Sequence, residues 1–155
     1  LHLVGRLPVL DNVVAGALPR MGWWHSVCRL FDDQTLAQAH RALESVGMLH
    51  LMHQRADQLS GGERQKVAIA RALMQHALWI LADEPTAALD PVASFEICEI
   101  LAKQAKKSGL ISVVHQPELV PVLADRVIGI RAGQVVVDCP VQAFTADVQE
   151  FLYSE

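Results

Sequence analysis

The stretch Leu78-Trp79-Ile80-Leu81-Ala82 is a short, continuous apolar run that ends abruptly in Asp83-Glu84-Pro85. Such a run is typical of a strand that is buried on both faces in a parallel sheet. Asp90 and Pro91 then have the pattern of a helix cap followed by proline at the first helical position, and Leu110-Ile111-Ser112-Val113-Val114 is a second apolar run. Strand, crossover helix and strand form a βαβ unit, so the two strands are predicted to be parallel.

Helices are predicted upstream of this unit. Between Leu36 and Val46, apolar residues recur at the spacing of one helical face, and Asp32-Asp33 can cap that helix. A short helix within residues 9–14 is expected to take Asp11 or Asn12 as its cap. Two strands around Ala132-Gly133 predict a β-hairpin downstream. The fold class is therefore α/β, with a helical subdomain over residues 1–77 and part of a parallel-sheet core over residues 78–155.

Composition excludes several classes of protein. The chain has 155 residues, of which 52% are hydrophobic and 19% charged, so it can bury a core and is not disordered. A net charge of −4 argues against a general nucleic-acid binder and against a polybasic membrane anchor. No apolar run reaches the length of a membrane-spanning helix. The three cysteines are scattered, which suggests a reducing compartment.

Polar residues follow both predicted strands. Asp83 and Glu84 end the first strand, and His115 follows the second. In a parallel sheet, ligands gather at the carboxyl ends of the strands, so neighbouring strands would bring these residues to one rim. Two carboxylates and an imidazole suit metal binding and the activation of a water molecule. The alternatives are a simple turn after the first strand and a structural histidine.

The sequence Ser60-Gly61-Gly62-Glu63 has two interpretations. Ser60 and Glu63 alone would form a capping box at a helix start. A capping box does not require Gly61 and Gly62, and glycine costs up to about 1 kcal/mol in a helix. Two glycines at a helix start let a phosphate approach the backbone N–H groups and the positive end of the helix dipole. The sequence therefore favours a phosphate site.

Four motifs in this order resemble the ATP-binding cassette family, the ATPase subunits of ABC transporters. They run from Leu59 to Leu73, from Ile80 to Thr86, from Ala88 to Pro91, and from Val113 to Gln116. The resemblance covers essentially the whole chain. It implies the fold of a P-loop NTPase, with ATP and Mg²⁺ as cofactors and catalysis by positioning and charge stabilisation.

The resemblance also implies a role for each matching residue. Ser60, Gly61, Gly62 and Glu63 stand in the signature motif, which contacts the γ-phosphate of ATP held by the opposite subunit. Asp83 ends the Walker B strand and would hold Mg²⁺. Glu84 matches the general base, Asp90 lies in the D-loop at the dimer interface, and His115 matches the switch histidine. A member of this family would work as a head-to-tail homodimer docked to a permease on the cytoplasmic face of the membrane, without nucleic acid.

A finer resemblance points to the ATPases of phosphonate importers, which act with a solute-binding protein. It rests mainly on Leu3-Val4-Gly5-Arg6-Leu7, Asn12-Val13-Val14-Ala15-Gly16, Trp23-Trp24, Arg55-Ala56-Asp57-Gln58-Leu59 and Ala124-Asp125-Arg126-Val127-Ile128. Importers of other small solutes, and lipoprotein-release or cell-division ATPases, share many of these features. The transported substrate is set by the binding protein and the permease, and this chain does not define it.

One family element is absent from these residues. The 155 residues contain no G-x-x-x-x-G-K-[ST] phosphate-binding loop and no Gly-Lys pair, and the chain begins with Leu1 rather than Met. The expectation is an ATPase of this family with about its N-terminal third removed. Alone it is predicted to be inactive, and marginally stable because of an exposed sheet edge. A short module that supplies only the signature half-site and a gene remnant are the alternatives.

Overall fold

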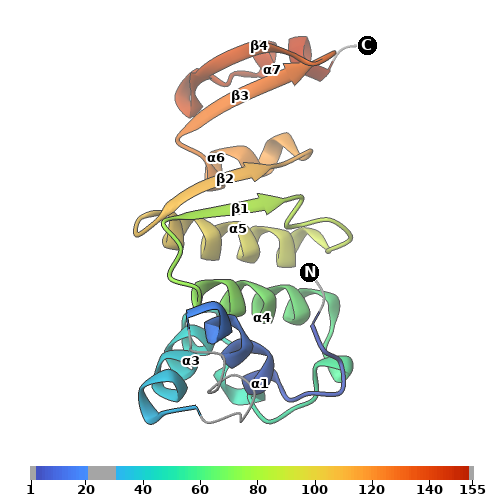
Figure 1. Cartoon of the computed structure of the whole chain (residues 1–155). Coiled ribbons are helices and arrows are strands. Elements are labelled where there is room, and N and C mark those ends of the chain that lie inside the picture. Colours follow the sequence, from blue (N-terminus) through green and yellow to red (C-terminus); the bar gives the residue numbers. More distant parts are fainter. Residues whose placement is uncertain (1–2, 21–30, 154–155) are drawn as a thin grey trace.

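A computed structural model of the chain describes residues 3–20 and 31–153, so that Trp23, Trp24 and Cys28 lie outside the described residues. The elements follow one another along a stack, with helices at one end, a parallel strand pair with its helix in the middle and a hairpin at the other end (Figure 1). The main helices are α1 (Val9–Val14), α3 (Asp33–Ser45), α4 (Gly61–Leu73), α5 (Pro91–Ala105), α6 (Val120–Leu123) and α7 (Ala146–Tyr153). The strands are β1 (Trp79–Asp83), β2 (Gly109–Val113), β3 (Arg126–Arg131) and β4 (Gln134–Pro140). Short 3₁₀ turns connect them, η1 (Ala15–Arg20), η2 (Leu49–Leu51), η3 (Ala56–Gln58), η4 (Pro117–Leu119) and η5 (Val141–Ala143).

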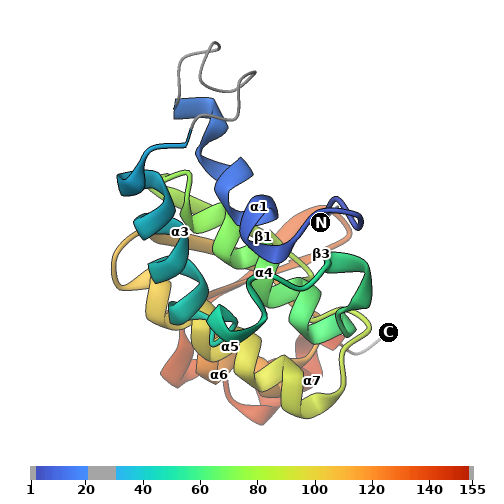
Figure 2. The same ribbon diagram turned by 90° about the horizontal axis from the view of Figure 1, so that it is seen from below.

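Three helices enclose a core at the first end of the stack. Helices α1, α3 and α4 pack on one another, and Figure 2 shows them together at the near end of the molecule. Their inward side chains, such as Val13, Leu43 and Val67, have no exposed surface. At Gly16 the chain passes so close to α4 that an added Cβ would lie 2.0 Å from the carbonyl oxygen of Arg71. Only glycine fits there without moving the backbone.

Helix α1 begins differently from the sequence prediction. Its N-cap is Pro8, not Asp11 or Asn12. Asn12 is instead 1% exposed, and its Oδ1 accepts a hydrogen bond from Val4 N at 2.8 Å while its Nδ2 donates to Val4 O at 3.1 Å. The side chain thus ties the segment before the helix to it. The helices predicted from the Asp32 and Ser60 caps are present as α3 and α4.

The βαβ unit is present with parallel strands, as predicted. Strand β1 pairs with β2 in a register that sets Leu81 opposite Ile111. Helix α5 begins after the Asp90 cap with Pro91 in its first turn, and it lies along one face of the pair (Figure 1). Its buried side chains, including Ile97 and Leu101, cover that face.

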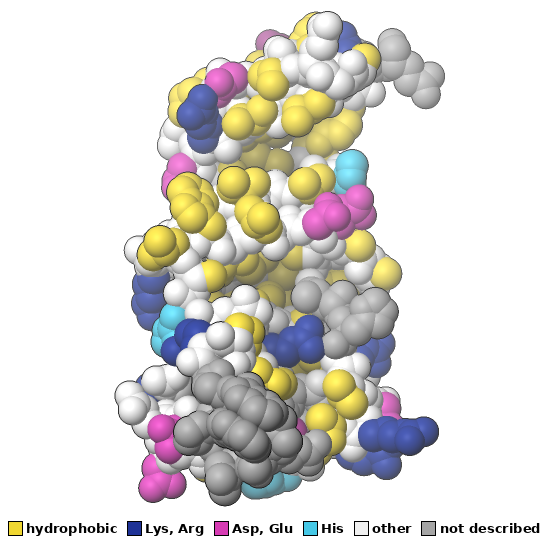
Figure 3. All heavy atoms as spheres, in the orientation of Figure 1, with side chains coloured by type: hydrophobic (Ala, Val, Ile, Leu, Met, Phe, Trp, Pro, Cys, Tyr) yellow, Lys and Arg dark blue, Asp and Glu magenta, His cyan; other side chains and the backbone are white. Residues whose placement is uncertain are grey.

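The prediction that both strands are buried on both faces is wrong for the described residues. Burial alternates along β1, and Leu81 is 77% exposed while Ile111 is 57% exposed. Helix α5 covers one face, and no described element covers the other, which carries apolar side chains in Figure 3. The apolar composition of the strands is typical of strands that are covered on both faces. The layer that would cover the second face is not among the described residues.

The hairpin is confirmed as an antiparallel pair of β3 and β4. Ala132 and Gly133 connect the strands with φ values of 50° and 76°, which suit the tight turns that match strand twist. Helix α7 packs on both strands. Within residues 3–20 and 31–153 the two strand pairs remain separate sheets, each of two strands. Among the same residues, no helix is long and apolar enough to cross a membrane.

Candidate functional site

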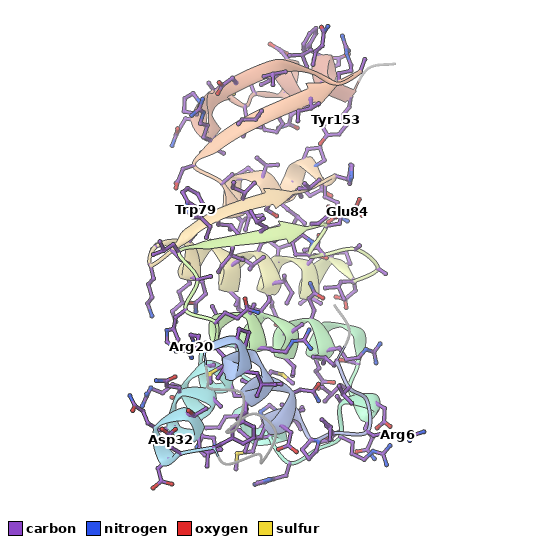
Figure 4. All side chains as sticks on the ribbon, viewed as in Figure 1. Arg6, Arg20, Asp32, Trp79, Glu84 and Tyr153 are labelled. Carbon is purple, nitrogen blue, oxygen red and sulfur yellow. The ribbon has the colours of Figure 1, made fainter. Side chains whose placement is uncertain are left out.

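The carboxyl ends of β1 and β2 lie side by side and bring two of the predicted residues into contact. Glu84 follows β1 directly, and His115 lies two residues after β2. Glu84 Oε1 is 3.0 Å from His115 Nε2, and both side chains are largely exposed. Asp83 is the last residue of β1 and lies opposite Val113 of β2. The parallel pairing therefore delivers a carboxylate and an imidazole to one rim, and Figure 4 labels Glu84 at this edge.

Glu84 has a strained backbone. Its φ is 43°, in the left-handed region that few residues other than glycine adopt. Its N–H donates to the carbonyl oxygen of Val113 at 3.1 Å, which extends the strand pairing by one residue. At this position the Glu84 side chain contacts His115. Strained residues of this kind cluster where geometry is tied to function.

The first turn of α4 is a capping box. Ser60 Oγ accepts a hydrogen bond from Glu63 N at 3.3 Å, and Ser60 N donates to Glu63 Oε2 at 2.7 Å. The hydrogen bond from the Ser60 N–H to the carboxylate holds the pKa of Glu63 below its ordinary value. The prediction that Ser60 and Glu63 form a capping box is thus confirmed. A phosphate-binding role of this turn would come in addition to the capping box.

The two glycines of this turn face the start of α5 and the loop that precedes it. A Cβ added at Gly62 would lie 3.4 Å from Ala93 Cβ, and one added at Gly61 would lie 3.6 Å from Leu89 Cδ2. These distances amount to van der Waals contact, so packing alone does not demand glycine at either position. The absence of side chains keeps the backbone N–H groups of this turn approachable.

A cavity of about 250 Å³ lies between the first turn of α4 and the start of α5. Five residues that the sequence singled out line it: Ser60, Gly61, Gly62, Glu63 and Asp90. Asp90 Oδ1 accepts a hydrogen bond from Ala93 N at 3.0 Å and so caps α5. The N-terminal ends of α4 and α5 lie on the same side of the molecule as the carboxyl ends of the strands (Figure 1).

The candidate residues thus form two groups. Glu84 and His115 form one, and the lining of the cavity forms the other, with the loop of residues 85–89 between them. Ala87 N donates to Glu84 O at 3.1 Å and Leu89 N to Thr86 O at 3.2 Å, so the loop is held by its own turns. A second positive φ, 61° at Ala88, bends the chain into the Asp90 cap. The loop therefore sets the spacing between the two groups.

Sequence reasoning missed two residues of the cavity. Lys66 of α4 and Glu96 of α5 line it and form a salt bridge at 2.5 Å. They lie 30 residues apart in the chain, and neither belongs to a cap or a strand end. No local pattern in the sequence points to such a pair.

The carboxylates at the carboxyl end of β1 are of the donor type that binds magnesium. Asp83 and Glu84 supply adjacent carboxylates, and Mg²⁺ is commonly held by one or two carboxylates together with phosphate oxygens and water. No group of three or more His, Cys, Asp or Glu side chains within the described part of the chain could hold a metal ion by itself.

Known proteins are similar to this chain in sequence. A sequence model of the ABC transporter family matches residues 2–87. The "Phosphonates import ATP-binding protein PhnC 1" of Synechococcus sp. is 44% identical over 154 residues, which are 98% of this chain and 59% of that protein. The chain thus spans about three fifths of the length of that relative.

Solved structures have the same fold. CbiO1 from Clostridium perfringens, part of the transporter complex CbiONQ, gives a TM-score of 0.80 at 27% identity, over 96% of this chain and 56% of that one. The ATP-binding cassette MJ0796, in a dimeric post-hydrolysis state bound to ADP and Pi, gives 0.72 at 28% identity, over 92% and 60%. The α/β fold is therefore that of the ATP-binding cassettes, a branch of the P-loop NTPases. With a family match over more than half of its length, this chain belongs to the ABC transporter family.

Proposed function

We propose that these residues form part of the ATP-binding subunit of an ABC importer, which couples ATP hydrolysis to transport. The observation that carries the proposal is the 3.0 Å contact between Glu84 and His115 at the ends of two parallel strands. A carboxylate with an imidazole partner can orient a water molecule and accept its proton. The rigid strand ends hold both groups in place, which suits a reaction that depends on positioning.

Each group of residues has a separate task in this proposal. Glu84 would act as the general base and His115 would contact the γ-phosphate, while Asp83 would hold Mg²⁺. The first turn of α4 would present its N–H groups to a nucleotide bound by a second subunit, and Asp90 would lie at that dimer interface. The N–H groups and the helix dipole at this turn suit a phosphate. We also propose the division into a helical subdomain, residues 1–77, and a catalytic-core portion, residues 78–155.

The phosphate cradle of the reaction is not among these residues. The 155 residues contain no G-x-x-x-x-G-K-[ST] motif. The backbone N–H groups and the lysine of such a loop hold the nucleotide phosphates. We therefore propose that this stretch of chain does not hydrolyse ATP by itself. Mg²⁺-dependent hydrolysis by the isolated 155 residues, abolished by Glu84→Gln, would contradict this.

The transported solute is proposed to be a phosphonate. The support is the name of the Synechococcus relative, a phosphonates import ATP-binding protein that is 44% identical. The subunit would then dock to a permease at the cytoplasmic face of the membrane, and a solute-binding protein would deliver the phosphonate. Importers of other small solutes remain the competing assignment.

The catalytic proposal is tested in the natural gene product at its full length. Glu84→Gln removes the proton acceptor but keeps the size of the side chain, so ATP turnover is expected to fall at least about a hundredfold. Glu99→Gln is the matched control, because Glu99 is an exposed glutamate of α5 outside the cavity lining, and it should leave turnover unchanged. Equal turnover in both variants would overturn the proposal. A protein without turnover that still lowers or raises the activity of a partner ATPase would favour the half-site module.

The substrate proposal is tested in the organism. Deletion of the gene should abolish growth on methylphosphonate as the phosphorus source and leave growth on phosphate unchanged. Glu84→Gln should behave as the deletion does, and Glu99→Gln as the wild type. Growth of the deletion strain on methylphosphonate would contradict the phosphonate assignment without affecting the catalytic one.

A further inference from the structure

A salt bridge joins the two helices that border the cavity. Lys66 Nζ lies 2.5 Å from Glu96 Oε2, although the two residues are 30 positions apart in the chain. The Lys66 side chain is only 21% exposed, whereas that of Glu96 is 50% exposed. Both residues lie within two turns of the N-terminal ends of their helices. The pair therefore ties together the starts of α4 and α5.

The two helix starts also meet through small and apolar residues. Where they meet, Gly61 and Gly62 have no side chain to interlock with α5. Ala93 and Leu89 lie against that turn and contribute apolar contacts only. A hydrogen-bonded ion pair adds a preferred direction to such contacts. Lys66 and Glu96 therefore supply a directional contact between the starts of α4 and α5.

Lys66 also influences the cap of its own helix. The pKa of Glu63 lies below its ordinary value, mainly because the Ser60 N–H donates to the carboxylate, and the charge of Lys66 contributes in the same direction. Lys66 lies three positions after Glu63, on the same face of α4. Lys66 thus pairs with Glu96 of α5 and supports the ionised form of Glu63 in its own helix.

We propose that Lys66 and Glu96 are positioning residues. Their ion pair aligns the first turn of α4, which carries the signature motif, with the first turn of α5, which the Asp90 cap begins. The two turns then keep a fixed position relative to each other. This inference rests on the proposed function, because the two turns carry the residues assigned to nucleotide contact and to the dimer interface. Neither side chain needs to touch the nucleotide. Loss of either one lets the two turns move independently.

Four backbone amides report on this alignment without any nucleotide. Glu63 N donates to Ser60 Oγ and Arg64 N to Ser60 O in α4, while Ala93 N and Ser94 N donate to Asp90 in α5. In the full-length natural gene product, Lys66→Ala should raise hydrogen exchange at Ala93 and Ser94 by about two- to fivefold, the range of a partly exposed ion pair. Glu96→Ala should raise exchange at the two amides of α4 by the same factor.

Rescue and control variants separate alignment from general destabilisation. Lys66→Arg keeps the cation and should retain slow exchange in both helices. Arg126→Ala removes an ion pair with Asp138 at 2.7 Å in the hairpin and should leave the four amides unchanged. If Lys66→Ala affects only the amides of α4, or if Arg126→Ala affects all four, the proposal is wrong.

The kinetic readout connects the alignment to the reaction. Each alanine variant should lower kcat for ATP by about two- to fivefold with KM unchanged, and Lys66→Arg should keep the kcat of the wild type. Unchanged kcat despite faster exchange in the opposite helix would overturn the positioning role and leave the proposed function standing. If Glu84→Gln also leaves turnover unaffected, both proposals fail.

Discussion

The helical part of the described chain, residues 3–20 and 31–77, and the α/β part, residues 78–153, bury their apolar side chains to different extents. In the helical part, Leu43 and Val67 have no exposed surface. In the α/β part, Leu81 is 77% exposed and Ile130 66% exposed. Among the large apolar side chains that are exposed in the described residues, only Val4 belongs to the helical part.

The difference follows from the geometry of the two kinds of element. An amphipathic helix needs cover along one stripe, so α1, α3 and α4 can enclose a core among themselves. A strand of a parallel sheet is apolar on both faces and needs a layer on each, and α5 supplies one of the two. The first part is therefore expected to be the stable unit, and the second to depend on further contacts.

The largest expected effect is a loss of stability when a leucine is replaced by alanine. This loss is expected to differ between the helical part and the α/β part. Leu43→Ala leaves a cavity in the helical core and should lower the free energy of unfolding by about 2–5 kcal/mol. Leu81→Ala removes a largely exposed side chain and should change it by less than about 0.5 kcal/mol. Urea unfolding of the 155-residue chain measures both. Equal losses would show that the exposed face of β1 is buried in solution.

Two glycine substitutions test how tightly each part is packed. Gly16→Ala places a methyl group against the backbone carbonyl of Arg71 and should cost about 1–3 kcal/mol. At Gly109 the obstacle is the indole of Trp79, 2.2 Å from an added Cβ, and this side chain is 61% exposed and free to rotate away. Gly109→Ala should therefore cost less than about 1 kcal/mol and shift the tryptophan fluorescence.

A reversed order of these two costs in thermal unfolding would contradict the comparison. It would mean that Trp79 is held as firmly as a backbone carbonyl. The ring would then be part of a core rather than of an open face.

The exposed face also predicts self-association. Leu81 and Ile111 lie opposite each other in a strand pair with uncovered apolar surface, which favours edge-to-edge and face-to-face contact between molecules. Replacing both by lysine should lower the fraction of aggregated 155-residue chain measured by sedimentation. The same double substitution at exposed Gln34 and Gln134 is the charge control. A reversible, cooperative melt of the unmodified monomer would count against this prediction.

The smallest effect concerns the capping box at the border between the two parts. The pKa of Glu63 in the folded chain is below its ordinary value of 4.5, because Ser60 N–H stabilises the ionised form. The corresponding stability is present above pH 4.5 and is lost as the pH falls through the lower folded pKa. Glu63→Gln keeps a capping side chain but removes the titration. The melting temperature of the variant should therefore change less than that of the wild type between pH 6 and pH 3.

Local signals predicted the secondary structure well. The caps at Asp32, Ser60 and Asp90 begin helices where the side-chain oxygen of each accepts a backbone N–H. These are interactions within three residues, so the sequence contains them in full. The prediction that Asn12 caps α1 is wrong because its side chain forms hydrogen bonds with the preceding segment. Such contacts override the local preference of a residue.

The candidate site was predictable in part. The meeting of Glu84 with His115 follows from two apolar runs and a crossover helix, because parallel strands end at one edge. The positive φ of Glu84 and the salt bridge of Lys66 with Glu96 were not predictable. Both depend on how close separate elements come, which no spacing in the sequence encodes.

The order of motifs, the helix caps and the polar residues at the strand ends determined the family and the candidate residues from the sequence alone. These features are local, and their physical meaning does not depend on distant parts of the chain. Only the tertiary structure decided that one face of β1 and β2 is uncovered and that the starts of α4 and α5 share a cavity. Burial and alignment are properties of pairs of elements, because each surface is defined by what packs against it.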